Sequence, residues 1–272
     1  MNRRRFLAGL AATGATATAT VSVGCATRSS PNPPAPLRVL TYNLHHGEGE
    51  DGRLDLERIA AVIRAANPDL VALQEIDRRA TRTGNVDQAA EYFRLTGLHG
   101  WYGAAMPFQG GEYGQALLSR WPLESPRVLR LPGTPGREPR IAVAAFVETP
   151  AFGRIRWVGL HLDASREDGD RWEQAGALLA DLRQDALPTL MAGDFNATPD
   201  SRVMQRLLDP ATGWTDTAQG SAAPTSPAGQ PKSRIDYVLA SPGSRWQVLE
   251  SRVLPEAVAS DHRPLLAVVR WA

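Results

Sequence analysis

The pattern of apolar and polar residues along the chain predicts strands and helices in a mixed order. Leu56, Ile59 and Ile63 recur at helical spacing, and Pro68 ends that helix. Further amphipathic helices are predicted over 85–97, 168–184 and 200–208. Short runs of aliphatic and β-branched residues predict strands over 37–44, 69–76, 114–120, 140–149, 154–163, 187–195, 234–241, 246–254 and 262–271.

This order is neither the regular alternation of a parallel α/β protein nor the pattern of an all-β protein. Two mixed sheets that pack together, with helices outside, accommodate it. The chain has 272 residues, of which 43% are hydrophobic and 22% charged, and no long apolar run follows its N-terminal segment. We therefore predict a single α/β domain over 37–272, without a membrane-spanning helix.

The first 36 residues differ in composition from the rest of the chain and predict export. Residues 1–25 combine a basic start with a weakly apolar middle, as export signals do. Within them, the segment RRRFL at 3–7 is similar to the twin-arginine translocation signal. Residues 26–36 are rich in Pro and Ser and predict an extended tether between the signal and the domain.

Cys25 is the only cysteine of the chain and has two interpretations. The segment 23–25 resembles the end of a bacterial lipoprotein cleavage box, in which the cysteine is lipidated, although Ser22 stands where leucine is usual. The alternative is ordinary cleavage after Ala-Thr-Ala at 15–17. We expect a periplasmic protein or a lipoprotein anchored to the membrane surface. In either case the domain has no disulfide and no thiolate metal site.

The net charge is weak evidence against a protein that grips duplex nucleic acid. The chain has 30 basic and 29 acidic residues, but three of the basic ones are Arg3, Arg4 and Arg5. The remainder holds 27 basic and 29 acidic residues, a net charge of −2. Non-specific binding of nucleic acid usually requires a clear basic excess.

The segment LPTLMAGDFNATPDS, at 187–201, ends an apolar strand with two polar side chains. Residues i and i+2 of a strand face the same side, so Asp194 and Asn196 are expected to project together. Asx residues also end strands as ordinary turns, because their side chains bond the nearby backbone. This segment alone does not separate a functional site from a turn.

Polar residues recur where other predicted strands begin or end. These positions carry carboxylate, amide or imidazole groups at Asn43, His45, His46, Gln74, Glu75, His161, Asp163, Asp194, Asn196, Asp236, Asp261 and His262. Ligands of α/β proteins gather at one edge of the sheet, so these groups are expected to converge. Carboxylate, amide and water ligands select Mg²⁺ or Mn²⁺. The sequence lacks His-Glu-x-x-His, Gly-x-Ser-x-Gly and P-loop motifs, which disfavours a zinc hydrolase, a serine hydrolase and a P-loop enzyme.

Seven segments that carry these residues follow one another in a recognisable order. They are TYNLHHG, LVALQEID, GEYGQALLSRWPL, GLHLD, MAGDFNATPDS, RIDYVLAS and SDHRPLLAVV. Together they resemble the endonuclease/exonuclease/phosphatase superfamily over residues 37–271. The resemblance implies a deoxyribonuclease I-like fold, a four-layered α-β-β-α sandwich of two mixed sheets flanked by helices. It also implies hydrolysis of phosphoester bonds with a divalent metal, usually Mg²⁺, with Mn²⁺ as the alternative.

The resemblance implies metal and water roles for four residues. Glu75 is similar to the main metal carboxylate of the family, supported by Asn43 and Asp261. Asp194 resembles the residue that orients and deprotonates the attacking water. Phosphoryl transfer depends mostly on positioning and on neutralising charge, and oxygen ligands around a hard cation supply both.

The resemblance also implies phosphate-side roles for five residues. The Asn196 amide would donate to a phosphate oxygen. His262 would place a second donor on the same phosphate, held in orientation by Asp236. His161 resembles a second catalytic imidazole of some branches, and Arg140 resembles the arginine that several members use on the phosphate side.

Departures from the family pattern leave the substrate open. Gln115 stands where relatives often have asparagine, and Leu160 stands where threonine is common before the histidine. His45, His46 and Glu112 lie either at the rim of the site or on the solvated surface. These differences concern substrate contacts and not the expected metal site.

The predicted function is an exported, metal-dependent phosphoesterase in which water attacks a phosphomonoester or phosphodiester in line. The expected partner is a phosphorylated small molecule, a lipid or a nucleic acid, and the protein is expected to be a monomer. Within the same superfamily the alternative is a DNA or RNA endonuclease. An alternative of another class is a non-catalytic surface protein that binds a cation or phosphate.

Overall fold

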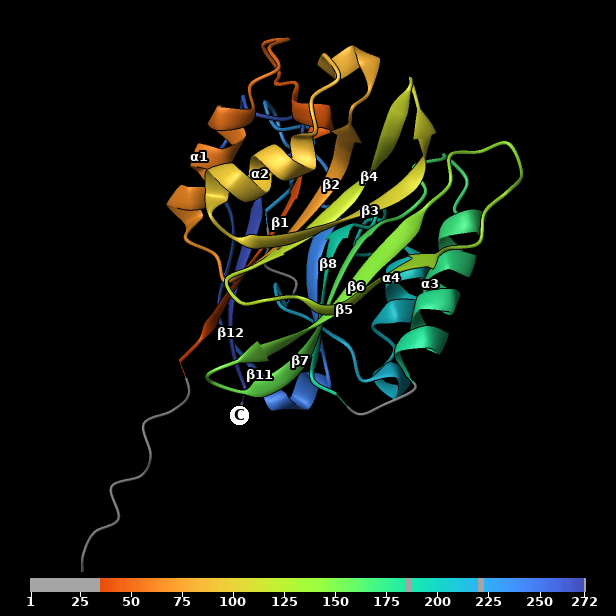
Figure 1. Ribbon diagram of the computed structural model, residues 1–272. Helices are drawn as coiled ribbons and strands as arrows, with labels where there is room; N and C mark the ends of the chain where they lie inside the picture. The colour runs from red at the N-terminus through yellow and green to blue at the C-terminus, as the bar shows by residue number, and fades with distance from the viewer. Residues whose placement is uncertain (1–34, 184–186, 220–222, 272) are drawn as a thin grey trace, which may run out of the picture. The chain divides into compact units, whose positions relative to one another are not determined.

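The computed structural model describes residues 35–183, 187–219 and 223–271. The predicted export signal and almost all of the predicted tether lie outside these residues. Within them, the strands form two mixed six-stranded sheets (Figure 1). No helix in this part of the chain has the length and apolarity needed to span a membrane.

The first sheet has the strand order β11-β12-β1-β2-β4-β3. β1 and β2 are parallel, and the other neighbouring pairs are antiparallel. Its strands are β1 (Leu37–Asn43), β2 (Leu70–Arg78), β3 (His99–Phe108), β4 (Gly111–Ser119), β11 (Trp246–Val253) and β12 (Leu265–Trp271).

The second sheet has the strand order β5-β6-β7-β8-β10-β9. Here β7 and β8 are the parallel pair, and the other neighbours are antiparallel. Its strands are β5 (Glu124–Arg130), β6 (Ile141–Thr149), β7 (Gly153–His161), β8 (Thr189–Asp194), β9 (Thr215–Asp216) and β10 (Asp236–Ser241).

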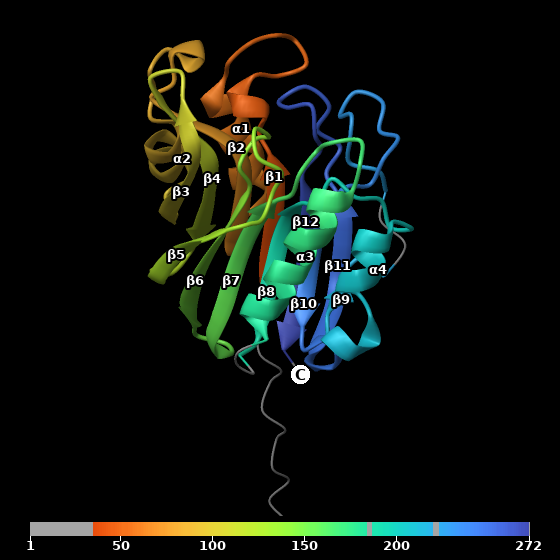
Figure 2. The same cartoon turned by 90° about the vertical axis from the view of Figure 1, so that its right-hand side faces the viewer.

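Helices cover the outer face of each sheet (Figures 1 and 2). α1 (Leu56–Ala66) and α2 (Gln88–Thr96) pack on the first sheet. α3 (Gly169–Leu182) and α4 (Arg202–Leu207) pack on the second. The result is the four-layered α-β-β-α sandwich that the sequence predicted, so the predicted fold class is confirmed.

The ends of α1 and α2 follow local signals in the sequence. The carboxylates of Asp55 and Asp87 accept backbone N–H groups in the first turn of each helix. Asn67 and Gly97 take the left-handed conformation at the C-terminal ends, which frees the chain to leave the helix.

The core lies in three layers, of which the middle one holds the two sheets together. This layer includes the fully buried side chains of Val39, Leu117, Val143, Trp157 and Leu190. The outer layers fill the space between each sheet and its helices. Because the central strands are buried on both faces, they appear in the sequence as nearly continuous apolar runs.

Three strands were not predicted from the sequence, and all three lie at sheet edges. β3 ends the first sheet, and β5 and β9 end the second. β3 is rich in Gly and Ala and partly exposed, β5 contains Pro126, and β9 has only two residues. Edge strands bury little apolar surface, so their alternation of apolar and polar residues is weak.

The parallel strand pairs bring polar residues to one edge of the sandwich. β1 and β2 align Asn43 with Gln74, and β7 and β8 align His161 with Asp194. The antiparallel strand β10 begins at the same place, where Asp236 is the register partner of Asp194. The polar strand ends noted in the sequence therefore meet because of the topology.

Close approach of the two sheets requires glycine at position 159. A Cβ atom there would lie 2.8 Å from Cδ2 of Leu117 and 3.3 Å from Cβ of Ala72, both in the facing sheet. We expect Gly159→Ala to lower the free energy of unfolding by about 1–3 kcal/mol, as overpacked cores do. Urea denaturation measures this.

The matched control is Gly133→Ala, because a Cβ at Gly133 meets no atom within 4 Å. It is expected to change the free energy of unfolding by less than about 0.5 kcal/mol. Equal denaturation midpoints for both variants would contradict this account of the sheet packing.

Candidate functional site

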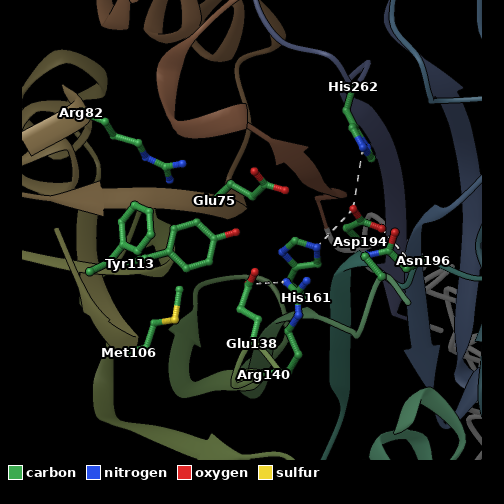
Figure 3. Close-up of a pocket in the computed structure, with 12 residues that line it drawn as sticks. Glu75, Arg82, Met106, Tyr113, Glu138, Arg140, His161, Asp194, Asn196 and His262 are labelled. Atoms are coloured by element: carbon green, nitrogen blue, oxygen red, sulfur yellow. Dashed lines mark hydrogen bonds and ion pairs between the residues drawn. The ribbon is translucent and has the colours of Figure 1, made fainter. Parts of the chain in front are cut away.

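A pocket of about 330 Å³ opens at the edge where these strand ends meet (Figure 3). Six residues singled out from the sequence line it: Glu75, Arg140, His161, Asp194, Asn196 and His262. Two more, Asn43 and Asp236, lie behind this lining and bond to its members. The fold thus brings together eight of the nine residues expected to form the site.

Asp194 is the most enclosed member of the pocket, with only 1% of its surface exposed. Its Oδ1 atom accepts the backbone N–H of Asn196 at 2.8 Å, and its Oδ2 atom accepts the Asn43 amide at 3.1 Å. Nε2 of His161 lies 3.5 Å and Nε2 of His262 3.8 Å from the same Oδ2 atom. Burial raises the pKa of the Asp194 carboxyl, and the charge of Asp236 raises it further.

Asn196 reaches the pocket by a route other than strand alternation. The strand ends at Asp194, and Asn196 takes a left-handed φ of 48°. The Asp194 side chain closes an Asx turn on the Asn196 backbone. The expected same-face placement in a strand is therefore wrong, yet both side chains line the pocket. The turn and the site are the same structure.

Glu75 enters the pocket from an irregularity in β2. The pairing of β2 with β4 shifts between Leu73 and Ile76, and Glu75 has a φ of 58°. This bulge turns a strand residue toward the site, at a backbone cost of about 1–3 kcal/mol. Oε1 of Glu75 accepts the Asn43 amide at 3.0 Å, so that amide bridges the carboxylates of Glu75 and Asp194.

His262 and Asp236 form a buried pair. Nδ1 of His262 donates to Oδ2 of Asp236 at 2.9 Å, and each residue is at most 6% exposed. Burial lowers the pKa of His262, but the charge and the hydrogen bond of Asp236 outweigh it and raise the pKa to about 10. His262 is therefore an imidazolium near neutral pH, with Nε2–H toward the Asp194 side of the pocket.

His161 has the opposite protonation state. Burial, the positive Arg140 and the positive His262 lower the pKa of His161 well below its ordinary value. The ring is therefore neutral next to Asp194. Arg140 stands beside it and forms an ion pair with Glu138, with Nη1 3.1 Å from Oε1.

Among the predicted site residues, Asp261 alone neither lines the pocket nor has a described hydrogen bond to a residue that does. Its carboxylate accepts the Ser260 hydroxyl at 3.3 Å, and its backbone carbonyl accepts the Ala228 N–H. It still lies close enough to raise the pKa of the neighbouring His262. The loop that carries it turns the His262 ring inward and leaves Asp261 beside the pocket.

The residues whose roles the sequence left open lie outside the lining of this pocket. Gln115 is buried and donates to the Ile141 carbonyl at 2.6 Å, and Leu160 is part of the core. His46 lies 3.5 Å from the Glu48 carboxylate. Glu112 forms an ion pair with Arg78.

Six lining residues were not identified from the sequence. They are Arg82, Met106, Phe108, Tyr113, Glu138 and Ala164. Tyr113 lies within the GEYG segment, but the others follow no strand-end pattern. They come from the segment after β2, from β3 and β4, and from the segments before β6 and after β7, so tertiary packing and not a local signal brings them to the pocket.

The residues present fit a divalent cation at Glu75. Its carboxylate lies in the pocket, and no Lys or Arg of the described ranges comes within 4.0 Å of it. Carboxylate oxygens are the ligands that Mg²⁺ prefers. The Asn43 oxygen accepts the His45 N–H at 3.1 Å, so Asn43 orients Glu75 through its nitrogen.

A second acidic group is less suited to hold a metal. One ligand atom each from Asp194, Asp236 and His262 lies within 4.8 Å of the others. The protonated His262 ring, however, has no free lone pair to offer a metal. Asp236 already accepts the hydrogen bond from Nδ1–H of that ring. This cluster is therefore a hydrogen-bonded group of two carboxylates and an imidazole, and Glu75 is the carboxylate that could hold a metal.

Comparison with known proteins identifies the family. A sequence model described as the endonuclease/exonuclease/phosphatase family matches residues 40–262. The chain belongs to this family. Its members generally depend on a divalent metal. The uncharacterized protein YbhP of Escherichia coli K12 is 28% identical over 252 residues, which cover 86% of this chain and 96% of YbhP.

Solved structures of the endonuclease/exonuclease/phosphatase family share the fold. A family protein from Beutenbergia cavernae is 28% identical, with a TM-score of 0.73 over 88% of this chain and 72% of that chain. The mannosyl-6-phosphatase Bt3783 of Bacteroides thetaiotaomicron is 18% identical, with a TM-score of 0.71 over 86% of this chain and 100% of that chain. The chain is thus a member of a family of phosphoesterases.

The pair of His262 and Asp236 generates a prediction about protonation. In Asp236→Asn the negative charge is lost while burial remains, so the pKa of His262 is expected to fall by about 1–3 pH units. NMR titration of the His262 ring in metal-free protein measures this. Asp209→Asn, at an exposed carboxylate, is the control and should leave the titration unchanged. The same midpoint in both variants would contradict the assigned pairing.

Proposed function

We propose that this protein is an exported, Mg²⁺-dependent phosphoesterase that hydrolyses a phosphomonoester or phosphodiester by in-line attack of water. The observation that carries the proposal is the buried Asp194 carboxylate, placed at the pocket beside a neutral and a protonated imidazole. The export signal predicted over residues 1–25 supports an extracytoplasmic location.

Asp194 acts as the base of the proposed reaction. Its pKa is raised by burial, which makes it a better proton acceptor than an ordinary carboxylate. Water adds to phosphorus as its proton passes to Asp194, and the bond between phosphorus and the alcohol oxygen breaks on the opposite side. The departing alkoxide takes a proton from solvent. A phosphomonoester gives the alcohol and inorganic phosphate, and a phosphodiester gives the alcohol and a phosphomonoester.

The phosphate is bound by donors that surround Asp194. The His262 imidazolium directs Nε2–H to one phosphate oxygen, and Asp236 fixes the ring by holding Nδ1–H. The Asn196 amide donates one N–H to the Leu162 carbonyl at 3.1 Å and keeps a second for substrate. The Arg140 guanidinium adds a positive charge. A Mg²⁺ ion at Glu75 would neutralise phosphate charge.

A small phosphorylated molecule is favoured over nucleic acid. A pocket of about 330 Å³ is at the lower end of the range for small-molecule sites. The chain without its three N-terminal arginines has a net charge of −2. A family member with the same fold is a mannosyl-6-phosphatase. Nuclease activity and metal binding without turnover are the outcomes that would displace this proposal.

The base role of Asp194 is testable by a nearly isosteric change. Asp194→Asn is expected to lower kcat by about 10²–10⁴, because the amide cannot accept the water proton. The assay uses Mg²⁺ with p-nitrophenyl phosphate, bis-p-nitrophenyl phosphate, sphingomyelin and plasmid DNA, with and without chelator. Asp200→Asn, at an exposed carboxylate six residues away, is the matched control. Turnover that survives both chelator and Asp194→Asn would refute the proposal.

The metal role of Glu75 is testable without turnover. Mg²⁺ is expected to raise the melting temperature of the protein, because a ligand that binds the native state stabilises it. Glu75→Gln is expected to raise the Mg²⁺ concentration needed for half of that shift at least about tenfold. Glu112→Gln, whose carboxylate pairs with Arg78 outside the pocket, is the control. The same midpoint for both variants would remove Glu75 from the metal site.

A further inference from the structure

The pocket has two opposite sides, and the proposed reaction uses only one of them. Asp194, Asn196 and His262 lie on one side, while Arg82, Met106 and Tyr113 lie on the other (Figure 3). Glu75 lies between them. In-line displacement places the leaving group opposite the attacking water. If water is activated at Asp194, as proposed above, the leaving group points toward Arg82 and Tyr113.

Arg82 is fixed as a rigid part of this second side. Its Nε and Nη2 atoms donate to the two oxygens of Asp77 at 2.7 and 2.9 Å, and the Asp77 side chain is fully buried. The guanidinium also lies over the Phe108 ring, 4.5 Å from its centre. The Nη1 group has no hydrogen-bond partner among the described residues and remains available to a ligand.

Tyr113 adds a polar atom that the protein itself does not satisfy. The residue is only 7% exposed, and it lines the pocket with its hydroxyl directed toward Glu75 and the centre (Figure 3). No residue in the described part of the chain bonds this hydroxyl. The hydroxyl therefore faces the open pocket, where it can both donate to and accept from a ligand.

The side chains on the Arg82 and Tyr113 side of the pocket favour some classes of leaving group over others. The Arg82 guanidinium covers one face of the Phe108 ring, and the Tyr113 ring packs against Phe108 with ring centres 6.1 Å apart. Phe108 therefore offers little free surface on which a nucleobase could stack. The charge of Arg82 is balanced by Asp77, which weakens attraction for a second phosphate. The groups left to contact a leaving group are the Nη1 group of Arg82 and the hydroxyl of Tyr113. The Glu138 carboxylate also lines the pocket and can accept hydrogen bonds from hydroxyl groups.

We propose that Arg82 and Tyr113 bind the leaving group of the substrate, and that this leaving group is a polyol such as a sugar. Hydroxyl oxygens of the polyol accept hydrogen bonds from Nη1 of Arg82 and from the Tyr113 hydroxyl. Another hydroxyl of the polyol donates a hydrogen bond to the Glu138 carboxylate. The inference rests on the proposed phosphoesterase function and adds to it the class of alcohol that is released.

The test compares two kinds of substrate that each release a six-carbon primary alcohol, with or without further hydroxyl groups. Glucose 6-phosphate and mannose 6-phosphate carry hydroxyl groups, whereas n-hexyl phosphate is a primary alkyl phosphate without them. We expect kcat/KM for at least one hexose phosphate to exceed that for hexyl phosphate by about 100-fold or more, since a site built for hydroxyls rejects a ligand that lacks them. Chelator-sensitive hydrolysis of p-nitrophenyl phosphate is measured in parallel.

Tyr113→Phe isolates the contribution of one hydroxyl. The ratio of kcat/KM for the hexose phosphate to that for hexyl phosphate is expected to fall about tenfold, the value of one lost hydrogen bond. The melting temperature should not fall, because that hydroxyl has no partner in the described structure. Tyr102→Phe is the matched control, because Tyr102 also packs beneath an arginine, Arg78, on the same sheet but outside this pocket. It should leave the ratio unchanged.

Arg82→Gln combined with Asp77→Asn tests the other contact. The double change removes both charges together, so no buried carboxylate is left unpaired. The same ratio is expected to fall at least about tenfold. Circular dichroism and the melting temperature verify that the variant is folded.

The outcomes separate the two proposals. Equal hydrolysis of hexose and hexyl phosphates, or a Tyr113→Phe variant that loses activity equally on both, overturns the polyol assignment while leaving the phosphoesterase intact. Preferred cleavage of plasmid DNA overturns it as well. If no substrate, including p-nitrophenyl phosphate, shows chelator-sensitive turnover, the proposed function itself fails and the polyol assignment fails with it.

Discussion

Burial of the Asp194 carboxylate is the constraint on which the rest of the site depends. A carboxylate that is 1% exposed costs several kcal/mol unless its neighbours compensate for lost water. The compensation comes from the Asn196 backbone, the Asn43 amide and two imidazole rings. These groups belong to both sheets and to a C-terminal loop. The site therefore exists only once the whole sandwich has formed.

The same carboxylate lies between two imidazoles in different protonation states. Burial and two nearby positive charges keep His161 neutral, whereas the buried partner Asp236 keeps His262 protonated. When their surroundings shift the pKa values of two residues of the same type in opposite directions, one site can hold both an acid and a base at the same pH. Asp236 is itself the register partner of Asp194, so the pairing of β8 with β10 places these two carboxylates side by side, and the loop before β12 adds His262.

The two sheets contribute different functions to the pocket. The second sheet provides Asp194 and His161, whereas the first provides Glu75 from a strained bulge together with Arg82 and Tyr113. Residues that hold and cleave a phosphate can remain the same while the residues facing the leaving group change. This division is consistent with one fold that serves relatives as dissimilar in sequence as 18% identity.

The fold class, the central strands and most of the candidate site were predictable from the residues alone. Doubly buried strands read as apolar runs, and polar residues at their ends stand out against them. Three features of the site come from tertiary packing. Asn196 enters the pocket through a turn, Asp261 lies beside it, and Arg82 and Tyr113 line a side of it that no polar residue at a predicted strand end had marked. The physical reason is that edge strands and loops are positioned by long-range packing, which leaves no periodic trace in the residues that it brings together.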